Sequence, residues 1–266
     1  MTNYNYKADS WDDFIIDLKH KPAMKQWLGE QASESGSETF TGSKSFKHSM
    51  ELAENGCPVT REAIYKASFK VLSESLPEFD LSPVGVFPCI PAYSAGVPED
   101  MFTPSEFGNP VPKPIVRIVV NITASCHVDT DDIINRGAAI LALIDRVQAS
   151  GQRVELVAEF HSNSRQNSDT YAFSVTVKRP EEHIDLDRIA YAIAHPSMLR
   201  RSFFRVMEFT VPYRVDGYGR ATDFTDRVTS GDVYIKSMLS NTSDFDSRDK
   251  AKNAIEQVWD KATEVA

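Results

Sequence analysis

Hydrophobic residues follow two different periods in the centre of the chain. Residues 115–122 (IVRIVVNI) and 153–160 (RVELVAEF) are rich in β-branched side chains and predict two strands. Between them, apolar residues recur every three or four positions over 133–147, which predicts an amphipathic helix that ends before Gly151. Residues 170–178 (TYAFSVTVK) alternate between apolar and polar, so they predict a third strand that pairs with the second as a hairpin.

The pattern continues with a helix over residues 186–194, so the predicted order of the core is β-α-β-β-α. A further helix from Pro196, strands at 208–214 and 232–239, and a terminal helix at 247–266 follow. The fold class we expect is α/β (α+β), with a mixed β-sheet and flanking helices. An OB-fold does not match this order of elements.

Residues 1–76 are predicted to form a helical N-terminal extension to the α/β core at 115–266, the whole being one structural domain. The first ten residues are polar and predicted to be mobile. Ser10 is the expected N-cap of a first helix. Residues 77–114 contain nine prolines and predict an ordered, extended connection that lies on the core, with a binding lid as the alternative.

The net charge of −9 argues against a protein that coats duplex DNA by bulk charge, but it allows a local basic groove. The three cysteines (Cys57, Cys89 and Cys126) fit neither a disulfide framework nor zinc spacing, and we expect buried, reduced thiols. The N-terminus has no signal-peptide pattern, and no stretch has the length of a membrane span. The expected location is the cytoplasm of a bacterium or of an infected host cell.

The histidines are scattered, and motifs of hydrolases, P-loop proteins and dinucleotide-binding proteins are missing. We therefore predict that the protein is not an enzyme and needs no cofactor. One motif, Asn121-x-Thr123-x-Ser125, resembles a degraded form of the D-x-S-x-S metal site of von Willebrand A-type domains. Asn121 stands where that family has its metal-anchoring Asp, so the expected role is a polar strand end that caps the next helix, with a metal-dependent adhesion-like module as an alternative.

Basic and aromatic residues are concentrated between Pro196 and Arg220, in a chain that is acidic elsewhere. Arginine supplies phosphate contacts and aromatic rings supply stacking surfaces for bases, so this segment is a candidate interface for single-stranded nucleic acid. Two smaller basic clusters lie at 40–47 and around the predicted hairpin. The candidate nucleic-acid-binding residues are Lys44, Lys47, Arg165, Lys178, Arg179, Arg200, Arg201, Tyr213, Arg214, Tyr218 and Arg220. The alternative is that the arginines form ion pairs with the excess of acidic residues.

Three stretches, TFTGSKSFKHSMELAENGCP, NRGAAILALIDRVQASGQRVELVAEF and HPSMLRRSFF, resemble a phage-encoded protein family. Size and acidity are similar to the single-stranded-DNA-binding RNA polymerase cofactors (Drc) of enquatrovirus-like phages. That resemblance implies a fold unlike the OB type, binding of melted promoter DNA and recruitment of a phage RNA polymerase.

We therefore expect a single-stranded DNA-binding transcription cofactor. Its expected partners are single-stranded DNA and a phage RNA polymerase, and no binding to a membrane is expected. The alternative is a protein-only phage adaptor or host-takeover factor that docks a partner through its Pro-rich segment. The sequence determines neither the base preference nor the oligomeric state, and it allows a homo-oligomer.

Overall fold

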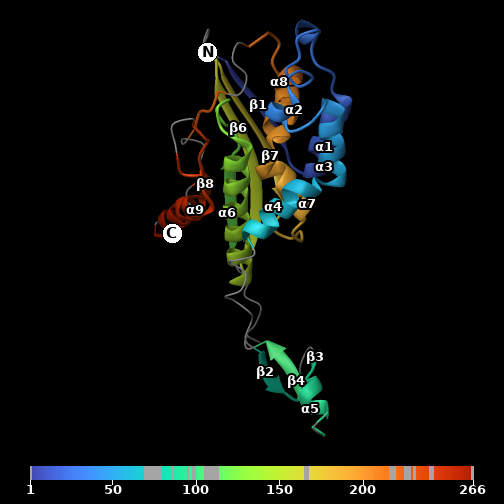
Figure 1. The fold of residues 1–266 in the computed structure, drawn as a ribbon, viewed down its shortest axis with the longest axis vertical. Helices are drawn as coiled ribbons and strands as arrows, with labels where there is room; N and C mark the ends of the chain where they lie inside the picture. The colour runs from blue at the N-terminus through green and yellow to red at the C-terminus, as the bar shows by residue number, and fades with distance from the viewer. Residues whose placement is uncertain are drawn as a thin grey trace.

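The structure is a computed structural model that describes residues 2–68, 79–84, 87–94, 96–97, 100–104, 114–164, 168–215, 220–224, 229, 232–239 and 243–264. Its centre is a five-stranded sheet in the order β1-β7-β6-β5-β8 (Figure 1). The strands are β1 (Asn3–Ala8), β5 (Ile115–Asn121), β6 (Arg153–Asn163), β7 (Thr170–Lys178) and β8 (Val233–Ile235). The sheet is mixed, because β6 and β7 are antiparallel while the other neighbours are parallel.

This arrangement confirms the predicted α/β fold with a mixed sheet, including the hairpin of β6 and β7. The predicted mobile N-terminus is wrong, because β1 pairs with β7 along its whole length, from Asn3 opposite Thr170 to Ala8 opposite Val175. Tyr4, Tyr6 and Ala8 alternate with exposed polar residues, so β1 adds its apolar positions to the core at the sheet edge.

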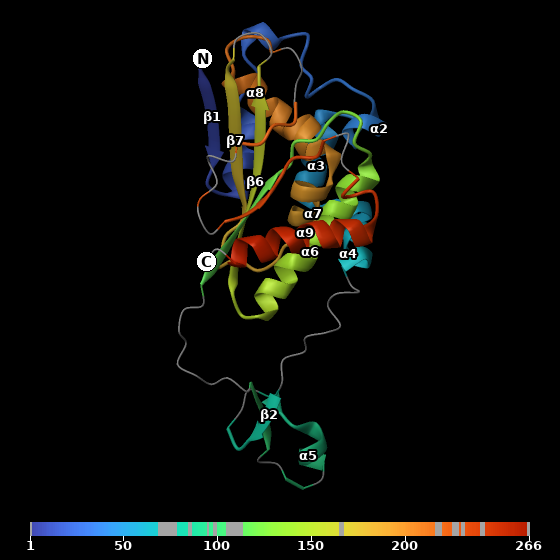
Figure 2. The same ribbon diagram turned by 90° about the vertical axis from the view of Figure 1, so that its left-hand side faces the viewer.

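Helices before and after the central strands lie on one face of this sheet, except the C-terminal helix, which lies beside β8 at the sheet edge (Figures 1 and 2). They are α1 (Trp11–His20), η1 (Lys25–Trp27), α2 (Glu38–Thr41), α3 (Phe46–Asn55), α4 (Pro58–Ser68), α6 (Thr130–Ala149), α7 (Leu186–Ala194), the π-helix η3 (Met198–Phe203), α8 (Phe204–Thr210) and α9 (Arg248–Glu264). Ser10 caps α1 as predicted, accepting a hydrogen bond from the backbone N–H of Asp13. The strand predicted at 208–214 is wrong: α8 continues to Thr210, and Glu208 is buried inside it.

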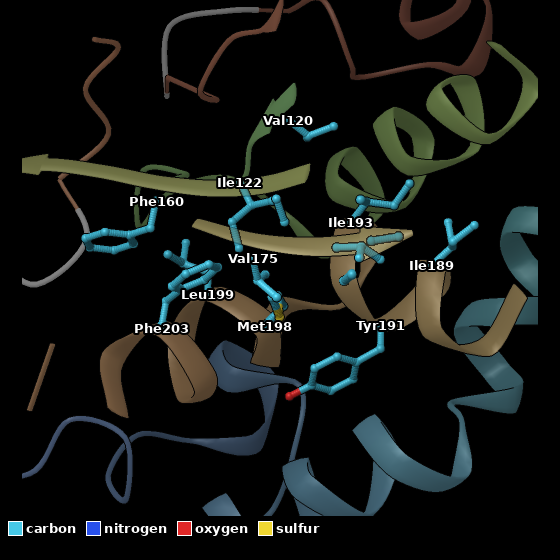
Figure 3. Close-up of a cluster of buried hydrophobic side chains, with 14 of the residues drawn as sticks. Val120, Ile122, Phe160, Val175, Ile189, Tyr191, Ile193, Met198, Leu199 and Phe203 are labelled. Atoms are coloured by element: carbon cyan, nitrogen blue, oxygen red, sulfur yellow. The ribbon is translucent and has the colours of Figure 1, made fainter. Parts of the chain in front are cut away.

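A single cluster of buried residues joins the sheet and helices (Figure 3). Phe160 of β6 stacks on Phe173 of β7 and on Phe203 of the π-helix, with ring centroids 5.3 and 5.7 Å apart. Helices α6 and α7 cross closely, because a Cβ built on Gly137 would lie 2.5 Å from the Cβ of Ala194. The N-terminal helices thus belong to the same core as the sheet.

Residues 79–104 contain a second, three-stranded sheet in the order β2-β4-β3, drawn at the bottom of Figures 1 and 2. Its strands are β2 (Phe79–Ser82), β3 (Phe87–Pro88) and β4 (Met101–Pro104), with helix α5 (Ile90–Ser94) between the last two. Among the described residues, the main core cluster has no buried member between Ile64 and Ile118. The described part of the Pro-rich segment therefore pairs with itself, where an extended connection on the core was expected.

Candidate functional site at the end of strand β5

A polar cluster closes the carboxyl end of β5. The side-chain amide of Asn121, the last residue of this strand, donates hydrogen bonds to the carbonyl oxygen of Thr222 (2.7 Å) and to Oδ1 of Asp223 (2.9 Å). Its own Oδ1 accepts from the backbone N–H and the hydroxyl of Thr123 (3.1 and 2.7 Å). Asp223 also accepts from the backbone N–H and the hydroxyl of Ser237, both at 2.9 Å. The cluster therefore ties the chain before β8 to the end of β5.

Hydrogen bonds determine the ionisation of Asp223. Burial by itself would raise the pKa of this carboxyl, but donors from Ser237, Asn121 and Tyr234 outweigh it and hold the pKa below its usual value. Burial and the negative charge of Asp223 both raise the pKa of Tyr234. Asp223 is therefore a carboxylate at neutral pH, and the Tyr234 hydroxyl, 2.9 Å from its Oδ1, is a neutral donor.

His161 of β6 extends the cluster across the neighbouring strand. Its imidazole is buried, and its ring stacks on Phe224 with centroids 4.7 Å apart. The backbone N–H of Phe224 donates to Nδ1 of His161 (3.3 Å), and Nε2 lies 3.0 Å from Oε2 of Glu159. These contacts fix residues 222–224 against the ends of β5 and β6.

A buried cation lies beneath this cluster. Arg136 of α6 is 1% exposed, and its Nη1 donates to the carbonyl oxygens of Asn121 (3.1 Å) and Lys236 (3.4 Å). Burial lowers the pKa of Arg136 to about 10, against an opposing contribution from Asp223, so the guanidinium stays charged at neutral pH. The ends of β5 and β8 are thus held by one internal cation.

On the other side of β5, Arg200 joins two loops. Its guanidinium lies 4.0 Å from the ring centroid of Phe40, and it donates to the carbonyl oxygens of Phe40 (2.5 Å) and Val128 (3.4 Å). Val128 belongs to the loop that follows β5, so the 33–45 loop sits at the end of this strand. Lys44 and Lys47, which follow in the chain, have exposed side chains.

Three of the predicted nucleic-acid contacts are buried and hold the protein's own backbone. Arg200 is 3% exposed and Arg201 is fully buried. Arg201 donates to the carbonyl oxygens of Ser33, Ser35 and Ser43 and to the hydroxyl of Thr41. Lys178 is 2% exposed, and its Nζ donates to the carbonyl oxygens of Val154 and Arg179. These three cations have no surface to offer to a phosphate.

The 211–224 segment places its predicted residues in different surroundings. The Tyr213 hydroxyl bonds to Asp169 and to the Tyr171 hydroxyl, which fastens it at the start of β7. Arg214 is exposed and forms an ion pair with Glu30. Arg220 is exposed, two residues before the Asn121–Thr222 contact.

The remaining predicted residues divide between the far end of the sheet and the part of the chain that is not described. Arg179 is exposed at the end of β7, and its guanidinium donates to the carbonyl oxygen of Asp9 (3.3 Å). Arg179 thus lies at the end of β7 that is farther from the hairpin turn, as the sequence predicted. Arg165 and Tyr218 lie outside the described residues.

The side chains of Asn121 and Thr123 form hydrogen bonds within the protein, and the backbone N–H of Ser125 donates to the carbonyl oxygen of Met238. In the described part of the chain, there is no group of three His, Cys, Asp or Glu side chains that could hold a metal ion. The sequence singled out Asn121 and Thr123 but missed Asp223, which is 102 residues further along the chain and has no local signal. Cys57 and Cys89 are buried as expected, whereas the Cys126 side chain in the loop after β5 is exposed.

The fold and this cluster define a mixed α/β protein whose polar and cationic residues gather around the carboxyl end of a central strand, where open α/β sheets commonly bind ligands. The chain belongs to the family described as Domain of unknown function (DUF7192), which it matches over residues 1–261. No curated protein and no solved structure matches it. Among the described residues, no helix is both long and apolar enough to cross a membrane.

Proposed function

We propose that this protein binds single-stranded DNA around the end of β5. The observation that supports this most is the presence of three exposed cations, Lys44, Lys47 and Arg220, that form no ion pair within the described part of the chain. Lys44 lies in the loop before α3 and Lys47 in its first turn, after Phe40, which Arg200 holds near this strand end. Arg220 lies two residues before Thr222, which Asn121 binds. Exposed cations next to such fixed points are suited to phosphate contacts.

Two half-exposed aromatic rings accompany these cations. Phe40 lies against Arg200 on one side of the strand end, and Phe224 lies against His161 on the other. Stacking of a base on an aromatic ring contributes roughly 1–3 kcal/mol and depends little on sequence. The acidic remainder of the surface disfavours wrapping of a duplex, which is consistent with a preference for single strands.

The biological role that we propose for this DNA binding is that of a phage transcription cofactor. In the host cytoplasm, the protein brings an RNA polymerase to melted promoter DNA. Support for this comes from the resemblance of the three sequence stretches and from the small 79–104 sheet, which offers a second surface away from the DNA-binding residues. On this proposal the protein acts by binding and not as an enzyme.

Fluorescence anisotropy with a labelled oligothymidylate tests DNA binding. We expect affinity for the single strand to exceed that for the matched duplex and to fall with salt, with a log–log slope of roughly −0.7 per phosphate contacted. The variant Lys44→Glu/Lys47→Glu/Arg220→Glu should weaken binding by about tenfold or more, because it removes three phosphate contacts. Lys25→Glu/Arg153→Glu reverses exposed cations elsewhere and is the control. Equal affinity for duplex and single strand would contradict the proposal.

A second candidate function, the protein-only adaptor, is favoured by exposed apolar side chains within residues 79–104. Val84, which follows β2, and Ile90 and Tyr93 of α5 are 79%, 64% and 62% exposed. Exposed apolar side chains are typical of protein interfaces when they form a contiguous patch. If the oligonucleotide shows no binding at low salt while the chain retains a phage protein through this unit, the adaptor is the correct function.

A further inference from the structure

A groove of about 980 Å³ lies between β8 and α9, at one edge of the five-stranded sheet. In Figure 1, α9 lies beside β8 at the left of the molecule. The apolar part of its lining includes Leu239, Phe245, Ala254, Val258 and Ala262. Leu239 is 43% exposed, and the three residues of α9 are half-buried, so an apolar surface remains open to an incoming chain.

The wall formed by β8 is a strand edge. β8 pairs with β5 and is the last strand in the order, so the backbone groups on its far side have no strand partner among the described residues. Unpaired N–H and C=O groups of an edge strand form a template for another extended chain. A strand edge next to an apolar surface is the geometry used when a peptide adds to a sheet.

The charged residues in the groove favour an acidic occupant. Lys236 and Lys261 are exposed, one on each wall, and neither forms an ion pair within the described part of the chain. Of the carboxylates in the lining, Asp232 is bound by Arg117 and Asp223 belongs to the polar cluster. Asp223 and Asp232 are half-buried, and Asp244 is the exposed carboxylate of the lining, so exposed lysines outnumber exposed carboxylates in the groove.

We propose that this groove binds an extended, acidic peptide segment of a partner protein, which adds to the sheet as a strand next to β8. Side chains of a strand point alternately to opposite sides. Apolar side chains at every second position of the peptide then pack on Leu239 and Val258 of the groove. The carboxylates of the peptide between them lie near Lys236 and Lys261. The groove reaches the polar cluster at Asp223, Tyr234 and Ser237, but its lining contains none of the proposed DNA contacts, so the inference does not depend on that function.

The test uses immobilised peptides in which Val or Ile alternates with Glu, Ser or Lys, probed with the full-length protein. We expect retention by the Glu series and little by the Ser and Lys series. The best Glu peptide is then labelled, and its affinity is measured by anisotropy. The same peptide with N-methyl groups on alternate backbone nitrogens should bind at least tenfold more weakly, because N-methylation removes the donors that pair with β8. Equal binding of the N-methylated peptide would overturn strand addition.

Charge reversal identifies the groove as the site. Lys236→Glu/Lys261→Glu should shift the preference from the Glu series to the Lys series while the thermal unfolding midpoint stays nearly unchanged, because both side chains are exposed. Lys25→Glu/Arg153→Glu makes the same change in net charge outside the groove and should keep the Glu preference. An unchanged preference in the groove variant would overturn the assignment.

Two other outcomes also decide against the proposal. If no peptide series is retained, an extended acidic partner is excluded. If sedimentation shows a dimer that Lys236→Glu/Lys261→Glu dissociates, the occupant is a second copy of this chain.

Discussion

Burial of the Asp145 carboxylate in α6 destabilises the folded protein by an amount that depends on pH. Its side chain is mostly buried without an ion pair or hydrogen bond among the described residues, and this burial raises its pKa to about 6. The unfolded chain has a pKa near 3.9 at this residue, so the folded state binds the proton more tightly. A raised pKa gives stability that is present below about pH 4 and is lost as the pH rises through 6.

Asp145→Asn should therefore stabilise the protein at pH 7 by about 1 kcal/mol, after allowance for partial exposure. The gain should vanish below about pH 4, where both side chains are neutral. Urea unfolding at several pH values measures this. Asp260→Asn makes the same exchange at an exposed position of α9 and is the control. A gain of equal size at low pH would contradict the explanation.

Asn121 places an uncharged amide group next to the carboxylate of Asp223. An Asp at this position would bring a carboxylate to the place where the amide nitrogen now lies, 2.9 Å from Oδ1 of Asp223. Two carboxylates this close repel each other unless a proton or cation lies between them. The hydroxyl of Thr123 and the carbonyl oxygen of Thr222 are further oxygens at hydrogen-bond distance from Asn121.

We expect Asn121→Asp to lower the thermal midpoint without metal and manganese to restore part of the loss, because oxygen ligands suit this ion. The native protein should show no such response. Asn121→Ala loses the same hydrogen bonds without adding a charge, so it should be destabilised and stay insensitive to manganese. Differential scanning fluorimetry with and without the metal measures this. Identical responses of the Asp and Ala variants would contradict the expectation.

Residue type alone did not reveal which cations are on the surface. Arg200 and Arg201 stand in a basic, aromatic stretch that is typical of nucleic-acid interfaces, yet both are buried in a π-helix that contacts loops from the N-terminal region. Their carbonyl partners in the N-terminal region lie about 160 positions away along the chain, and nothing in the local sequence indicates them. Exposure was predictable only for cations in Ser- and Gly-rich loops, such as Lys44.

At the scale of elements, local patterns predicted α1, α6, α7, α9, and the hairpin of β6 and β7, because their caps and periods lie within each segment. Two errors concern elements that depend on distant partners. β1 pairs with residues 167 positions away, and its polar composition hid its one-sided burial. Residues 208–210 remain helical, although their neighbours favour a strand, because Glu208 accepts hydrogen bonds from Ser33 inside the core.

The crossing of α6 and α7 allows a sharp test at this scale. In most helix interiors, replacing Gly by Ala stabilises by about 1 kcal/mol. At Gly137, however, the added Cβ would meet the Cβ of Ala194 at 2.5 Å and its Cα at 3.3 Å. Gly137→Ala should therefore destabilise by about 1–3 kcal/mol, because the helices must move apart.

The double variant Gly137→Ala/Ala194→Gly restores the space at the crossing. It should be more stable than Gly137→Ala alone, despite the second glycine. Chemical denaturation of both variants and the native protein measures the coupling between the two positions. Additive effects would show that the close approach is not the cause.

For the whole molecule, the sequence predicted a helical N-terminal extension and an α/β core in one structural domain, and the buried cluster includes residues from Ala8 to Ile255. The sequence could not predict the small 79–104 sheet, because prolines and aromatic residues are equally typical of a segment packed on a core. In the part of the chain that the structure describes, the buried cluster has no member between Ile64 and Ile118.

Replacing residues 79–104 by a short Gly-Ser linker should therefore leave the main core folded. We expect one cooperative unfolding transition, with stability within about 0.5 kcal/mol of the native protein, because none of the removed residues that the structure describes belongs to that cluster. Circular dichroism measures the transition, and anisotropy with the oligothymidylate shows whether DNA binding survives, as the position of Lys44, Lys47 and Arg220 predicts. Capture of a phage RNA polymerase should be lost in the same variant, since the small sheet carries the exposed apolar surface. A broad, non-cooperative transition would show instead that the small sheet is part of the folding unit.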